Sequence, residues 1–80
     1  MAKGADVNAK DEDGWTPLHF ACDQRNAAVF LINRGAKVNA VHKDGWTPLD
    51  EAIDSNDFQT ADLLRKHGGK TGEELKAEGK

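Results

Sequence analysis

The sequence predicts an all-α repeat fold, in which each unit is a tight turn followed by two short helices. The first observation is internal repetition: residues 4–18 align with residues 35–49, and eleven of the fifteen aligned positions are identical. The second is that both copies of the run DGWTPL are followed by apolar residues at helical spacing. The two segments are 31 residues apart, and repetition at about this period is the sequence signature of a solenoid of stacked repeat units.

The spacing between matching residues changes along the chain. It is 31 residues from Ala21 to Ala52 but 33 residues from Ala28 to Ala61. The first unit therefore lacks two residues between Asp23 and Ala28. We expect either a shortened turn between its two helices or a second helix that starts late.

The start of each unit has a local physical cause. The Asp-Gly step supplies the positive φ that a hairpin-like turn needs. The steps Thr16-Pro17 and Thr47-Pro48 then predict helix starts, because threonine caps the first turn and proline lacks an N–H that would be orphaned there anyway. Asp50, three residues after its threonine, can return a hydrogen bond to the cap, and His19 takes that place in the first unit.

Apolar spacing then predicts which helix faces are buried. The first helices have Leu18, Ala21 and Cys22 in one unit and Leu49, Ala52 and Ile53 in the other. The second helices carry Ala27, Ala28, Phe30, Leu31 and Ile32, then Phe58, Ala61, Leu63 and Leu64. Gly35 and Gly68 are expected to end them.

The last ten residues predict a different element. Thr71 and Glu74 match a capping box, and Leu75 is the residue able to dock on the preceding repeat. We expect residues 71–78 to form a short polar helix that covers the last unit.

The order turn, TPLH, helix, helix and GAKVNA resembles the ankyrin repeat, from Gly4 to Lys70. The chain departs from that pattern at the two-residue deletion and at Asp50, which replaces the signature histidine. In this register residues 4–11 are the tail of a preceding repeat, 12–43 the first repeat, 44–70 the second, and 71–80 a capping helix and tail.

The resemblance implies a module that binds a protein or peptide through a concave surface of turns and inner helices. By register that surface contains Lys10, Glu12, Asp13, Trp15, Asp23, Gln24, Val41, Lys43, Asp44, Trp46, Asp54 and Ser55. Tryptophan is enriched at interface hot spots, so Trp15 and Trp46 are either binding residues or residues that pack over the neighbouring turn. The carboxylates Asp13, Asp23, Asp44 and Asp54 would favour basic segments of a partner, or only solvate the surface.

Nothing in the sequence favours an enzyme, a metal site or a cofactor. The three histidines, His19, His42 and His67, form no metal-binding motif, and Cys22 has no adjacent base. We expect His19 to hydrogen-bond between adjacent turns, as the family's motif histidine does, and Cys22 to act as a small buried hydrophobe.

Two shorter motifs have ordinary explanations. The letters GGKT at 68–71 resemble the end of a phosphate-binding loop, but Leu64 stands where that motif needs glycine. Asn8 and Asn39 resemble the asparagine that is hydroxylated in some ankyrin proteins, and we expect them to hydrogen-bond the turn backbone instead.

Charge and hydropathy exclude several partner classes. The chain has 11 Lys and Arg against 14 Asp and Glu, a net charge of -3, so a nucleic-acid partner is not expected. The longest apolar run, residues 27–32, is far too short for a membrane span, and a soluble cytoplasmic protein is expected. One cysteine allows no internal disulfide.

A rival hypothesis is a structural scaffold without a natural ligand: an engineered, near-consensus chain or a piece of a longer array. The N-terminal face of the first repeat has no preceding helices to cover it. We therefore expect Leu18, Cys22 and Leu31 to be exposed there and to mediate a homodimer.

Overall fold

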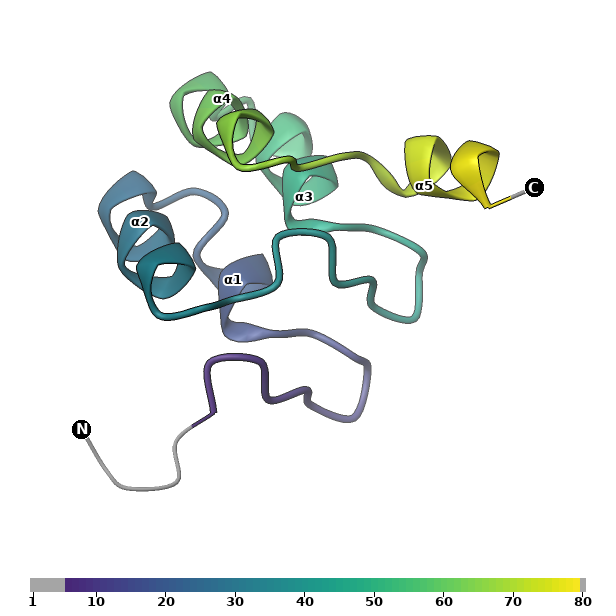
Figure 1. Cartoon of the computed structure of the whole chain (residues 1–80), viewed down its shortest axis with the longest axis horizontal. Helices are drawn as coiled ribbons and strands as arrows, with labels where there is room; N and C mark the ends of the chain where they lie inside the picture. Colours follow the sequence, from purple (N-terminus) through teal and green to yellow (C-terminus); the bar gives the residue numbers. More distant parts are fainter. Residues whose placement is uncertain (1–5, 80) are drawn as a thin grey trace.

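Two helix pairs stack one above the other in the computed structural model, which describes residues 6–79 (Figure 1). The first pair is α1 (Pro17–Phe20) and α2 (Arg25–Asn33), and the second is α3 (Pro48–Asp54) and α4 (Phe58–Lys66). A fifth helix, α5 (Gly72–Glu78), follows the second pair. Within the described range every regular element is helical, as predicted. Residues 4 and 5 of the expected tail, and residue 80 of the expected cap, lie outside that range.

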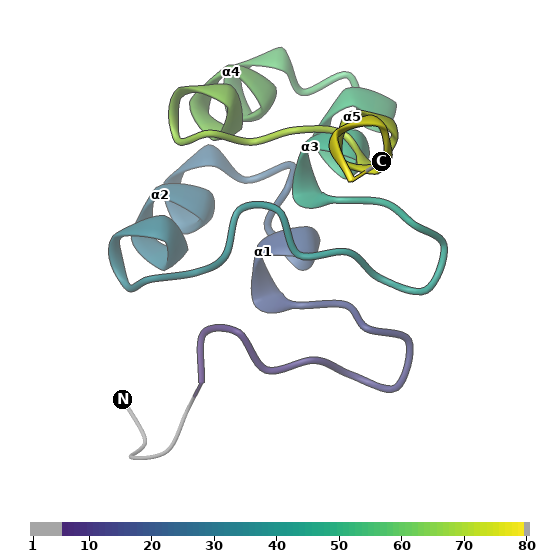
Figure 2. The ribbon, with the colours of Figure 1, turned by 45° about the vertical axis from the view of Figure 1, so that its right-hand side comes forward.

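Two hairpin-like loops project from the same side of the stack, one above the other (Figure 2). In the first loop the N–H groups of Asp11 and Gly14 donate to the carbonyls of Trp15 and Asp11; His42 and Gly45 repeat this pattern in the second. Gly14 and Gly45 have φ of 85° and 84°, as their Asp-Gly steps predict. The N–H of Lys43 donates to the carbonyl of Asp13 at 2.8 Å, so the two tips are joined.

The helix starts are confirmed. Thr16 and Thr47 cap α1 and α3 in complete capping boxes with His19 and Asp50, and each proline occupies the first helical turn. Thr71 caps α5 in the same way with Glu74. These caps depend on residues within four positions of each other, and sequence patterns predict such local interactions well.

The two-residue deletion is absorbed in a way that neither expectation foresaw. Helix α2 has nine residues, as α4 has, so it does not start late. The link between the helices is not shortened either, because residues 21–24 join α1 to α2 and residues 55–57 join α3 to α4. Instead α1 has four residues against seven in α3. The first unit loses helix length because the position of α2 is set by its packing on α1 and α4.

One hydrophobic core joins both units, and it corrects the expected self-association face. Leu18 is fully buried and Cys22 is only 8% exposed, in one cluster with Leu49, Ala52 and Leu64. Leu31 is half-buried against that cluster. The expectation that Leu18 and Cys22 are exposed was wrong, because α1 packs these side chains into the core it shares with α2 and α3 rather than outwards.

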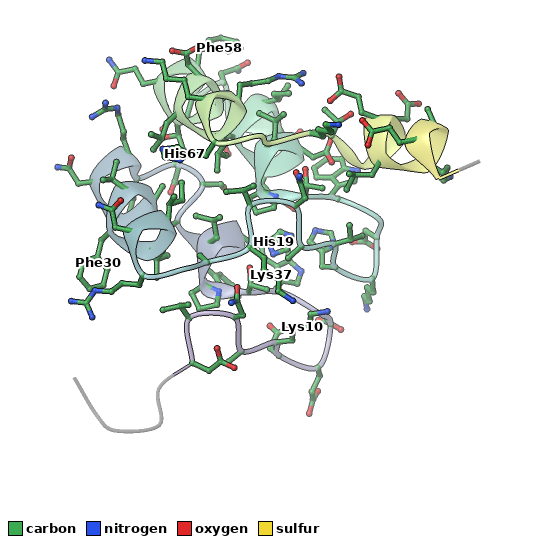
Figure 3. The ribbon with its side chains drawn as sticks, in the orientation of Figure 1. Lys10, His19, Phe30, Lys37, Phe58 and His67 are labelled. Atoms are coloured by element: carbon green, nitrogen blue, oxygen red, sulfur yellow. The ribbon has the colours of Figure 1, made fainter. Side chains whose placement is uncertain are left out.

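A second correction concerns the inner helix of the second unit. Ile53 was expected on the buried face with Leu49 and Ala52, and both of these are fully buried. Ile53 itself is 42% exposed. Phe30 and Phe58 are also exposed, and Figure 3 places them on the outer helices, well apart from each other.

Helix α5 is attached to the second unit by polar contacts. The hydroxyl of Thr47 donates to the carbonyl of Lys70 at 2.6 Å, and the N–H of Gly72 donates to Asp50 Oδ2 at 2.7 Å. Nη1 of Arg65 donates to both carboxylate oxygens of Glu74, at 2.9 and 3.2 Å, and Lys70 forms an ion pair with Glu78. Leu75 is half-buried.

Candidate functional site

A buried histidine connects the two hairpin-like loops. His19 begins in the capping box of α1, where its Nδ1 accepts a hydrogen bond from the N–H of Thr16 at 3.0 Å. Its Nε2 lies 3.0 Å from the carbonyl oxygen of Trp46, so Nε2 carries the proton and donates. Figure 3 shows His19 next to the second hairpin-like loop, which contains Trp46. The expected bridging role of His19 is confirmed.

Burial favours the neutral form of this imidazole. His19 is fully buried, and loss of solvation lowers its pKa from 6.5; the hydrogen bond to Trp46 opposes this and nearby His42 adds to it. The neutral ring with Nε2–H fits both neighbours, one donor and one acceptor. His19 is therefore structural, and its geometry offers no substrate contact.

The indole of Trp15 is covered by a residue from the next loop. The ring of His42 stacks on it with centroids 4.6 Å apart and an angle of 10° between the planes. His42 is buried, accepts the N–H of Asp44 at Nδ1, and donates from Nε2 to Glu51 at 2.7 Å. Trp15 also contacts Phe20, with ring centroids 5.0 Å apart. Trp15 is half-buried and packs over the neighbouring loop, which is one of the two roles expected for it.

Trp46 is more exposed than Trp15. It is the equivalent of Trp15 one repeat later, but it is 39% exposed. It lines a hollow of about 470 Å³ together with Asp50, Ile53, Asp54, Thr71 and Glu73. Its lining comes from the second hairpin-like loop, from α3 and from the N-terminal end of α5. The sequence predicts the same two roles for both tryptophans, but they differ in exposure and in the residues that surround them.

The surface formed by the hairpin-like loops and the inner helices α1 and α3 is called the loop face below. The residues predicted to bind a partner are exposed except for half-buried Trp15: Lys10, Glu12, Asp13, Asp23, Gln24, Val41, Lys43, Asp44, Trp46, Asp54 and Ser55. Lys43 and Asp13 form an ion pair, with Nζ and Oδ1 3.2 Å apart, and the hydrogen bond that Lys43 donates to Asp13 raises the pKa of Lys43.

Four residues of the hollow were not predicted as site residues: Asp50, Ile53, Thr71 and Glu73. Ile53 was assigned to the core, and Thr71 and Glu73 were assigned to the cap. The repeat gave no signal for them, because the offset of 33 residues in this part of the chain pairs His42 with Leu75 and not with Glu73. Asp50, the fourth, was recognised only as a capping residue.

Asn8 and Asn39 have matching structural roles. The amide of Asn8 donates to the carbonyl of Gly35 at 3.2 Å and accepts the N–H of Lys37 at 2.7 Å. Asn39 does the same with Gly68 and Lys70, at 3.0 and 2.7 Å. The expected bonding to turn backbone is confirmed, and it ties each loop to the following unit rather than to itself.

The remaining chemistry-bearing groups have structural surroundings. Burial raises the pKa of the Cys22 thiol to about 11, which disfavours the nucleophilic thiolate. Within residues 6–79 no cluster of three or more His, Cys, Asp or Glu side chains has the arrangement of a metal site. The GGKT run follows α4 and precedes the seven-residue α5. None of the helices in the described part of the chain has the length and apolarity needed to cross a bilayer.

Comparison with known proteins places the chain in a family. A family model described as ankyrin repeats, three copies, matches residues 1–74. Among curated proteins, the Ankyrin repeat and LEM domain-containing protein 1 homolog of Caenorhabditis elegans is 55% identical over 29 residues. That alignment covers 36% of this chain and only 4% of the relative, so the similarity concerns the repeat alone.

Proposed function

Because this chain belongs to the ankyrin repeat family, whose members are generally non-enzymatic protein interaction modules, we propose that it binds a protein partner through its loop face. The observation that carries the proposal is the exposure of Trp46 at a hollow on that face. An exposed tryptophan at a concave site is the kind of residue that dominates binding energy at interfaces. The partner is a protein or peptide, and the site of action is the cytoplasm.

The extent of the site follows from the positions of the exposed residues. Trp46 and Asp54 lie at one end of the loop face, and Lys10 and Glu12 lie on the first hairpin-like loop. We assign residues 4–11 to the tail of a preceding repeat, 12–43 and 44–70 to two repeats, and 71–80 to a cap. In this division both repeats contribute to the loop face, and the cap forms one edge of it.

Selection from a displayed peptide library tests the proposal. Binders should lose about tenfold or more in affinity with Trp46→Ala, the scale of an interface hot spot. The matched control is Phe58→Ala, because Phe58 is an exposed aromatic residue on outer helix α4. A library that yields no binder above background would support the rival hypothesis of a scaffold without a ligand. Binders that respond to Phe58→Ala and not to Trp46→Ala would place the site on the outer helices.

A further inference from the structure

The first unit contains an internal example of what its tryptophan holds. Against the indole of Trp15 lies a flat ring that carries an N–H, that of His42. The N–H points to a carboxylate oxygen of Glu51 at 2.7 Å. The arrangement is a planar nitrogen group held between an aromatic face and a carboxylate.

At Trp46 the described residues supply the aromatic face and the carboxylates but no such ring. The repeat offset of 33 residues in this part of the chain pairs His42 with Leu75, which carries no ring, and Glu73 supplies a carboxylate to the hollow. The hollow beside the indole is instead open, with a volume of about 470 Å³. Ile53 adds an apolar wall that is 42% exposed.

The charge of the hollow is one-sided. Among the described residues its lining has three carboxylates, Asp50, Asp54 and Glu73, and no Lys or Arg. Asp50 Oδ2 already accepts from Thr47 and from the N–H of Gly72. Within residues 6–79 Asp54 and Glu73 take part in no ion pair, whereas Arg65 and Lys70 are paired with Glu74 and Glu78. Charge complementarity therefore selects a cation.

We infer that this hollow takes an arginine side chain of the partner protein, an inference that rests on the proposed function. The guanidinium lies flat on the indole of Trp46, as the His42 ring lies on Trp15, and donates to Asp54 and Glu73. The aliphatic part of the arginine side chain contacts Ile53. Arginine fits better than lysine because its planar group stacks on an aromatic face and donates to two carboxylates in one geometry.

The direct test follows the two indole N–H signals in a nitrogen–proton correlation spectrum. The probe is the blocked tripeptide Gly-Arg-Gly, and Trp46→Phe identifies the signal of Trp46. The arginine peptide should shift the Trp46 signal and leave the Trp15 signal in place. The same peptide with citrulline, which keeps the shape without the charge, should shift neither, and the lysine peptide should bind more weakly.

Variants then test the contacts. Asp54→Asn and Glu73→Gln should each weaken binding of the arginine peptide by up to about fivefold, the range of exposed ion pairs. Asp62→Asn is the matched control, because Asp62 is an exposed carboxylate on α4, and it should leave binding unchanged. Circular dichroism of each variant verifies that the fold is retained.

Three outcomes would overturn the inference: equal binding of citrulline and arginine peptides, a shift at Trp15 alone, or no response at millimolar peptide. A Trp46 signal that shifts on dilution without peptide would assign the hollow to a second copy of the chain instead. Failure here is distinguishable from failure of the proposed function. Library-selected binders that lose affinity with Trp46→Ala but contain no arginine would leave the loop face as the binding site.

Discussion

His19 Nε2 lies 3.0 Å from the carbonyl oxygen of Trp46, 27 residues further along the chain. This hydrogen bond joins the start of α1 to the loop of the next unit, and its partner at Nδ1 is the cap residue of the same helix. One side chain therefore performs the local capping that Asp50 performs in the second unit and also links the two units. A protonated ring could no longer accept at Nδ1, so the capping contact with Thr16 depends on the neutral form, whereas the Nε2–H bond to Trp46 does not.

The stability of the chain should fall as the pH drops below 6.5. Burial lowers the pKa of His19 below its value of 6.5 in the unfolded chain, so the unfolded state binds the proton first in that window. The stabilisation that neutral His19 provides is complete above pH 6.5 and is lost as the pH falls through the lower pKa of the folded state. Urea unfolding at about pH 7.5 and about pH 5.5 should give a clearly lower midpoint at the acidic value.

The control for this effect is the variant set His19→Gln and His67→Gln. His19→Gln should be less stable at neutral pH by about 1 to 3 kcal/mol and should show a weaker pH dependence. His67 is exposed at the end of α4, so His67→Gln should behave as the parent does. The pKa of Glu74 is lowered from 4.5, mainly by the N–H of Thr71. Any stabilisation from Glu74 is therefore lost only below pH 4.5, outside the range compared here. A midpoint that rises on acidification would contradict the assignment.

Helix α2 should be stabilised by a better cap. Gln24 occupies its N-cap position with no side-chain hydrogen bond, whereas Asp57 at the same position of α4 accepts the N–H of Thr60 at 3.1 Å. Gln24→Asp should raise the free energy of unfolding by about 0.5 to 1 kcal/mol, through the cap and the helix dipole. Denaturant unfolding measures this, and Asp57→Ala should lose a similar amount. No gain from Gln24→Asp would mean that the backbone at residue 24 cannot place the carboxylate over the first turn.

The packing of α5 on the second hairpin-like loop should be sensitive to one methyl group. A Cβ at Gly72 would lie within van der Waals overlap of the carbonyl oxygen of Gly45, and backbone cannot move aside as a flexible side chain does. Gly72→Ala should destabilise the chain by about 1 to 3 kcal/mol or detach α5. Gly79→Ala is the matched control, since its nearest contact is 3.6 Å away and it lies just beyond the same helix. Equal thermal midpoints for the two variants would show that α5 does not press on the loop.

Cys22 should resist modification while the chain is folded. Cys22 is 8% exposed and the pKa of its thiol is raised to about 11, so the reactive thiolate is scarce at neutral pH. Reaction with a disulfide reagent should be slow without denaturant and should follow the unfolding curve. The variant Lys76→Cys, at an exposed position on α5, is the positive control. Rapid modification of Cys22 in the folded chain would indicate local opening of α1.

Local signals in the sequence were sufficient for much of this structure. The Thr-Pro steps, the capping partners and the glycines with positive φ were all predicted, because each depends on residues a few positions apart. The bridging role expected for His19 was also confirmed, since the motif recurs in register with the unit it bonds. The repeat itself determined the fold class, because two similar segments must adopt similar structures and can bury their apolar faces only by stacking.

The tertiary structure decided which surfaces the stack leaves exposed. Leu18 is buried and Ile53 is exposed although both are apolar residues on inner helices, because burial depends on which neighbouring unit covers each face. The same cause separates Trp15, covered by the ring of His42, from Trp46, which opens on a hollow beside α5. Two nearly identical sequence segments thus differ in their environments, since contacts between units are properties of the stack and not of either segment.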